Sequence, residues 1–76
     1  MNDTEAKTMT TAEIKQQVLA NMDTVRGLKY GLKVADLVFG YGVMPEIATA
    51  ALSQLVREGV LVVSGRTART NVYRAA

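Results

Sequence analysis

The sequence predicts an α+β fold in which three helices are followed by a two-stranded β-hairpin. Apolar residues repeat at helical spacing in three stretches that all precede Gly59. After this glycine, the β-branched runs 60–63 and 70–73 flank a connection that contains another glycine, which is typical of a hairpin. At 76 residues the chain has room for one domain.

The first predicted helix has a well-defined start. Residues 1–8 are polar and lack apolar periodicity, so we expect a disordered tail ahead of a domain at 9–76. Thr10 and Glu13 have the spacing of a capping box, in which each side chain accepts a hydrogen bond from the backbone N–H of the other. The apolar stripe that follows consists of Ile14, Val18, Leu19, Met22 and Val25. We expect this helix to end within residues 22–26.

Residues 23–32 form the least regular part of the chain. Gly27 and Gly31 interrupt this segment, and glycines at such spacing are typical of a loop. The apolar residues that alternate here, as they would in a strand, are Leu28, Tyr30 and Leu32. The segment is therefore predicted as a loop with a possible short strand.

Residues 33–59 contain the strongest pattern, two helices joined by a tight turn. Gly40 and Gly42 end the first of these helices, because glycine reaches positive φ without strain. Pro45 suits the first turn of the next helix, at 45–58, where its missing N–H needs no partner. The core-facing residues predicted for that helix are Ile47, Ala48, Ala51, Leu52, Leu55 and Val56. Its outer side carries Glu46, Thr49, Ala50, Ser53 and Arg57.

Two short helices joined by a tight turn form the helix-turn-helix layout. The residues that carry a closer resemblance are Asp36, Leu37, Gly42, Ala48, Leu52, Leu55 and the run 57–59, which leads into a strand. On these residues the segment 31–74 resembles a winged helix-turn-helix DNA-binding domain, although Val38 stands where that family commonly has a small residue. The resemblance implies that the helix at 45–58 lies in the major groove. It also implies that the hairpin at 60–74 is a wing on phosphate or the minor groove.

The candidate DNA-binding residues lie mainly on the third helix and the hairpin. On the helix, Arg57 can contact guanine or phosphate, and Gln54 can contact adenine. The arginines of the hairpin would contact phosphates or a narrow minor groove. Each position also has an ordinary alternative, since polar residues cover solvated helix faces and charged residues protect edge strands. The full candidate set is Lys33, Thr49, Ser53, Gln54, Arg57, Arg66, Arg69 and Arg74.

The charges are unevenly distributed along the chain. The formal net charge is +2, but residues 1–25 carry two basic and four acidic residues (−2), and residues 26–76 carry seven basic and three acidic residues (+4). The basic part contains the helix-turn-helix pattern, as in nucleic-acid binders. Cysteine and histidine are absent, which excludes disulfides, thiolate or imidazole metal ligands and Cys–His or Ser–His catalysis. The acidic residues Asp36, Glu46 and Glu58 lie at unrelated positions, and the sequence has no Gly-rich phosphate loop or nucleophile elbow. We therefore expect no enzyme activity, no cofactor and no metal.

The aromatic residues Tyr30, Phe39, Tyr41 and Tyr73 do not alternate with basic residues, as a stacking platform for single-stranded nucleic acid would require. We expect most of them in the core or at its rim, with Phe39 partly exposed as a partner-facing position. The apolar runs are too short to span a bilayer, and no signal-peptide core follows Met1. The expected location is the cytoplasm or the nucleoid.

These observations predict a small transcriptional regulator that binds double-stranded DNA in a sequence-dependent way. A few weakly discriminating contacts separate a target poorly from other sites, so two copies are expected. The predicted homodimer is held through residues 11–28, where Met22, Val25 and Leu28 supply apolar area. No small-molecule effector is evident. The alternatives are a protein-interaction module of the same fold and an RNA binder.

Overall fold

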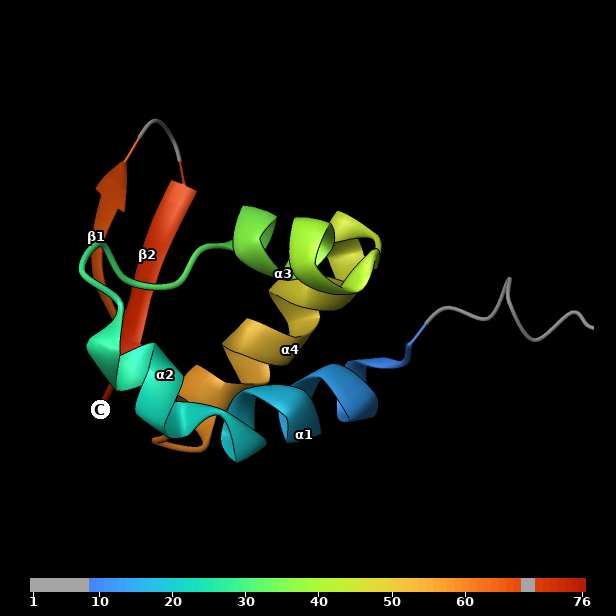
Figure 1. The fold of residues 1–76 in the computed structure, drawn as a ribbon, viewed down its shortest axis with the longest axis horizontal. Coiled ribbons are helices and arrows are strands. Elements are labelled where there is room, and N and C mark those ends of the chain that lie inside the picture. Colours follow the sequence, from blue (N-terminus) through green and yellow to red (C-terminus); the bar gives the residue numbers. More distant parts are fainter. Residues whose placement is uncertain (1–8, 68–69) are drawn as a thin grey trace, which may run out of the picture.

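The computed structural model describes residues 9–67 and 70–76. The described residues form α1 (Thr11–Ala20), α2 (Met22–Gly27), α3 (Val34–Tyr41), α4 (Pro45–Arg57), β1 (Leu61–Thr67) and β2 (Thr70–Ala75). The two strands pair antiparallel (Figure 1). The α+β class and the hairpin are thus confirmed, but the expected count of three helices is wrong, because the described residues form four. The tail expected at 1–8 lies outside the described residues.

The starts of α1 and α3 both depend on an acidic side chain in the first turn. The predicted capping box is confirmed: the Thr10 hydroxyl accepts from the Glu13 N–H at 3.2 Å, and the Glu13 carboxylate accepts from the Thr10 N–H at 2.7 Å. At α3, the Asp36 carboxylate accepts from the backbone N–H of Lys33 at 2.8 Å. A carboxylate at this position also favours the positive end of the helix dipole, which explains a start at Lys33 despite its poor capping side chain.

The additional helix, α2, results from a break in the helical backbone at Asn21. The Asn21 side chain donates to the Gln17 carbonyl at 2.7 Å, and its backbone leaves the helical region with φ −118° and ψ 29°. Asparagine side chains compete in this way for helix carbonyls. The helix predicted to run into 22–26 therefore ends at Ala20 and resumes as α2, whose Val25 is still buried in the core.

The segment after α2 is fixed on the edge of β2. Its possible strand is reduced to a single β-bridge, in which Leu32 and Tyr73 exchange two backbone hydrogen bonds of 2.8 Å each. The guanidinium group of Arg74 donates to the carbonyls of Leu28 and Lys29, both at 3.2 Å. The loop is thus attached to the hairpin at two successive residues of β2.

Gly31 allows this attachment because it lies directly on β2. Its φ is +77°, and a Cβ atom added there would lie 2.3 Å from Cγ1 of Val72 and 3.1 Å from the carbonyl oxygen of Tyr73. Glycine is therefore required at this position for both its backbone conformation and its small size.

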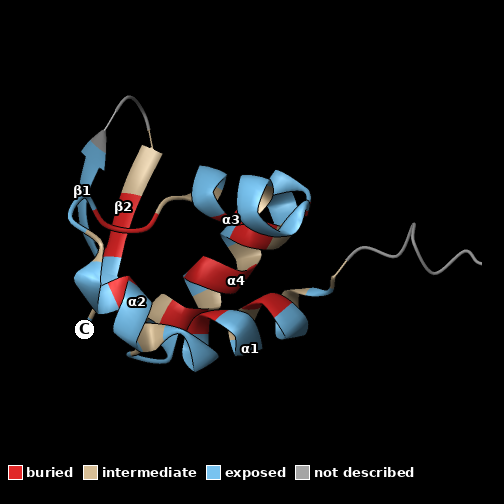
Figure 2. Ribbon diagram, in the orientation of Figure 1, coloured by how far each residue is buried: buried red, intermediate tan, exposed pale blue. Residues whose placement is uncertain are grey.

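The core surrounds α4, which lies between α1, α3 and the hairpin (Figures 1 and 2). The α4 residues Ala48, Ala51, Leu52 and Leu55 have no exposed surface. Their two alanines let neighbouring elements approach closely, and each buried leucine contributes about 1.5–3 kcal/mol to stability. The other core residues are Ile14, Val18, Val25, Leu32, Leu37, Val43, Leu61 and Tyr73. Burial of this one stripe leaves the opposite side of α4 exposed.

We predict that Gly31→Ala lowers the free energy of unfolding by about 2–4 kcal/mol, because it adds both backbone strain and a clash with β2. Gly27→Ala is the matched control, since its Cβ meets nothing within 4 Å and its φ is not positive. That control should change stability by less than about 1 kcal/mol. Urea denaturation of both variants measures the difference, and equal stabilities would contradict the described fit of the loop on β2.

Candidate nucleic-acid interface

The outer side of α4 carries the residues predicted from the sequence. Thr49, Ser53 and Arg57 are exposed along it, and Gln54 is half-buried at its margin. Glu46 is also exposed in the first turn of the helix, so this side has a carboxylate near its start and a guanidinium group at its end. The small side chains between them leave the helix backbone open to close approach by a ligand.

A hollow of about 380 Å³ joins this side of α4 to the hairpin, and we call it the α4 hollow. The residues that line it are Val34, Thr49, Arg66, Thr70, Asn71 and Tyr73. Thr49 of α4 therefore lies near Arg66 of β1, which brings together one candidate residue from each predicted DNA-contacting element. The other candidates on α4 do not line this hollow.

A second hollow of about 370 Å³, which we call the outer hollow, lies on the other face of the hairpin. The residues that line it are Tyr30, Lys33, Ser64, Gly65, Arg66, Val72 and Arg74. Successive strand residues point to opposite faces, so Asn71 and Tyr73 face the α4 hollow while Val72 and Arg74 face the outer hollow. Arg66, near the end of the hairpin, borders both.

The pairing register of the two strands determines which residues face each hollow. Val63 pairs with Tyr73, and after a bulge at Ser64 the pairing continues from Gly65 with Val72. The Ser64 hydroxyl donates to the Val72 carbonyl at 3.4 Å. Bulges bend and twist a strand locally, so this one turns the end of the hairpin relative to its base.

One of the predicted hairpin arginines, Arg74, has a structural role in addition to its position at the outer hollow. Arg74 has its guanidinium group on the carbonyls of Leu28 and Lys29, so it holds the loop in place while its charge faces the outer hollow. Arg69 lies outside the described residues. Lys33, which is also in the predicted DNA-binding set, lines the outer hollow and does not line the α4 hollow.

Sequence reasoning missed Asn71 and Tyr30 as site residues. Asn71 shares the α4 hollow with Thr49, and the alternation from buried Tyr73 along β2 would have placed it on that face. Tyr30 was expected in the core or at its rim, but it is 69% exposed. The amino group of Lys29 lies over its ring, 5.5 Å from the centroid. Only the tertiary structure brings Tyr30 beside the hairpin.

The expectation that most aromatic residues lie in the core or at its rim is wrong, because both Tyr30 and Phe39 are largely exposed. Tyr73 is buried, but Phe39 is 86% exposed and Tyr41 also lies at the surface. The short helix α3 directs Leu37 into the core, and Phe39, two residues later, points to the other side. Phe39 was predicted to be partly exposed, and its exposure is greater than predicted. Met44, directly before α4, is also exposed.

Three of the acidic residues outside α1 have local structural roles. Asp36 caps α3, Glu58 pairs with Lys15 of α1, and Asp23 pairs with Arg26 within α2. Within residues 9–67 and 70–76, no group of three or more His, Cys, Asp or Glu residues is arranged to hold a metal ion. The helices of this part of the chain also include none that is long and apolar enough to cross a membrane.

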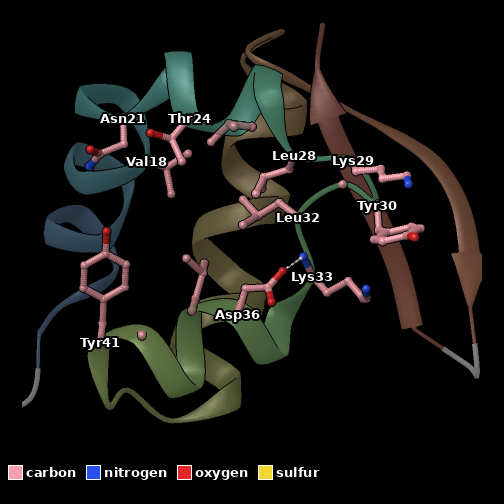
Figure 3. A pocket seen from close by; sticks show the side chains of 14 residues that line it. Val18, Asn21, Thr24, Leu28, Lys29, Tyr30, Leu32, Lys33, Asp36 and Tyr41 are labelled. Atoms are coloured by element: carbon pink, nitrogen blue, oxygen red, sulfur yellow. Dashed lines mark hydrogen bonds between the residues drawn. The ribbon is translucent and has the colours of Figure 1, made fainter.

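A hollow of about 650 Å³, larger than either hairpin hollow, lies between α1, α2 and α3 (Figure 3). Apolar side chains such as Val18, Leu32 and Leu37 line it, while Asn21 and Tyr41 lie on opposite sides. The nearby residues that were expected to supply apolar area for a dimer lie largely inside the protein. Val25 is buried, and Met22 and Leu28 are half-buried against the core.

Comparison with protein-family models, curated proteins and solved structures finds no match for this chain. Function is therefore inferred from the geometry and chemistry of its own residues.

Proposed function

We propose that the protein binds double-stranded DNA as a winged helix-turn-helix domain and acts as a small transcriptional regulator. In this proposal α4 enters the major groove, and the hairpin contacts phosphate or the minor groove. The α4 hollow is the observation that supports the proposal. It places Thr49 of the helix beside Arg66 and Asn71 of the hairpin, so one duplex can contact both elements at once.

The chemistry of these residues suits a duplex. Arginine contacts guanine edges and phosphates, asparagine pairs with adenine, and threonine accepts several partners. With 13 residues, α4 is about 20 Å long, and the small side chains on its outer side allow it to approach base edges. Arg57 at the end of α4 extends the contact along the backbone.

The exposed pair Phe39 and Met44 favours the alternative of a protein-interaction module, because solvent-facing apolar side chains often mark interfaces. The two functions make different demands on the chain. Docking through Phe39 and Met44 needs no positive charge at Arg57 or Arg66, whereas DNA binding does.

We predict that Arg57→Ala and Arg66→Ala each weaken binding to a labelled duplex by about 5- to 150-fold, the value of a good base or phosphate contact. Arg26→Ala is the matched control, since it removes the same charge from α2 and Arg26 lines neither hairpin hollow. Fluorescence anisotropy measures the affinities. Equal effects of all three variants would contradict the proposed surface, and equal competition by duplex RNA would favour RNA binding.

Duplex binding should also depend steeply on salt. If about four to six phosphates are neutralised, the slope of about −0.9 per phosphate predicts a ~10²–10³-fold loss of affinity for a fourfold rise in salt. The same titrations at several salt concentrations measure this slope. A flat response would support the protein-interaction alternative.

We further propose that two copies bind a palindromic site, with their α4 helices about one helical turn, ~34 Å, apart. The segment 11–28 remains the proposed contact, and its most exposed large apolar side chain is Leu19. Sedimentation equilibrium on palindromic and half-site duplexes should show two protomers on the first and one on the second. Leu19→Lys should reduce the pairing on the palindrome, and one protomer on both duplexes would exclude a dimer.

A further inference from the structure

The outer hollow combines an exposed aromatic ring with a concentration of positive charge. Tyr30 lies at one side of it, and Lys33, Arg66 and Arg74 supply cationic groups. None of the described residues that line it is acidic. Lys29 adds a further charge over the Tyr30 ring. Figure 3 shows Lys29, Tyr30 and Lys33 pointing away from α1, toward the side of the strands.

The ring is held at the surface by the backbone beneath it. On one side, Arg74 binds the carbonyls of Leu28 and Lys29. On the other side, Gly31 lies against Val72, and the next residue forms the β-bridge to β2. Tyr30 therefore has fixed residues on both sides, and its 69% exposure is a property of the folded loop.

This arrangement fits a ligand that has both an anionic backbone and flat aromatic groups. Because the amino group of Lys29 lies over one face of the Tyr30 ring, a ligand ring would stack on the other face. Phosphates on either side of that ligand ring would meet Lys33 and Arg66, which lie in the same hollow. An acidic peptide or an anionic lipid surface would satisfy the charges but would leave the role of the aromatic ring unexplained.

We propose that the outer hollow binds single-stranded nucleic acid, with an unpaired base stacked on Tyr30 and the adjoining phosphates on Lys33 and Arg66. In a duplex the faces of the bases are covered by their neighbours, so the ring selects an unstacked base. The site lies on the face of the hairpin opposite to the α4 hollow and shares only Arg66 with it, so stacking on Tyr30 can be tested separately from the proposed binding of duplex DNA.

The test compares a labelled oligothymidine with an abasic oligomer of the same length at low salt, using the full chain and fluorescence anisotropy. Stacking of one base should make the oligothymidine bind about 5- to 150-fold more tightly. Tyr30→Ala should abolish this preference, and Tyr30→Phe should retain it because the ring is preserved. Circular dichroism of the exposed-site variants confirms that they remain folded.

Two further variants separate base stacking from charge. Lys33→Gln should weaken the binding of both oligomers to the same extent, since it removes a phosphate contact and leaves the ring. Arg26→Ala should leave the preference for oligothymidine unchanged, because Arg26 does not line this hollow. Equal affinities of the wild-type chain for both oligomers would overturn the proposal. So would a preference that survives Tyr30→Ala, or equally good competition by a polyglutamate peptide or anionic vesicles.

Discussion

The packing of α4 is the constraint on which both hairpin surfaces depend. Ala48, Ala51, Leu52 and Leu55 are fully buried, and α1, α3 and β1 all pack around this helix. Turning α4 by one residue, or about 100°, would expose leucines at a cost of about 1.5–3 kcal/mol each and would bury polar groups from its outer side. The direction of Thr49 toward the hairpin is therefore a consequence of the core.

Local signals in the sequence were sufficient to predict the elements that carry this packing. Apolar spacing and Pro45 predicted α4, and the spacing of Thr10 and Glu13 predicted the two hydrogen bonds of the capping box. Local prediction was wrong where a side chain competes with the helix. Asn21 takes a carbonyl that the helix would otherwise use, so a continuous apolar stripe hides a break in the backbone.

The candidate site was only partly predictable, because tertiary contacts create it. Arg74 reaches a carbonyl 46 residues earlier in the chain, and no pattern in its own strand indicates that role. Tyr30 alternates with apolar residues in the sequence and so resembles a core position of a strand. The positive φ of Gly31 interrupts that alternation, which leaves Leu32 buried and Tyr30 exposed. Its cationic neighbours come from the loop and the hairpin together.

The same contacts that attach the loop to β2 also keep the two surfaces apart. A shift of one residue in strand register exchanges the two faces of a strand, and such a shift would move Asn71 to the outer face and Arg74 to the helix side. The bridge between Leu32 and Tyr73 fixes the register on one edge of β2, and the pairing with β1 fixes it on the other. A shifted strand would also lose the close packing of Gly31 against Val72. The orientation of each face of the hairpin therefore depends on the stability of this junction.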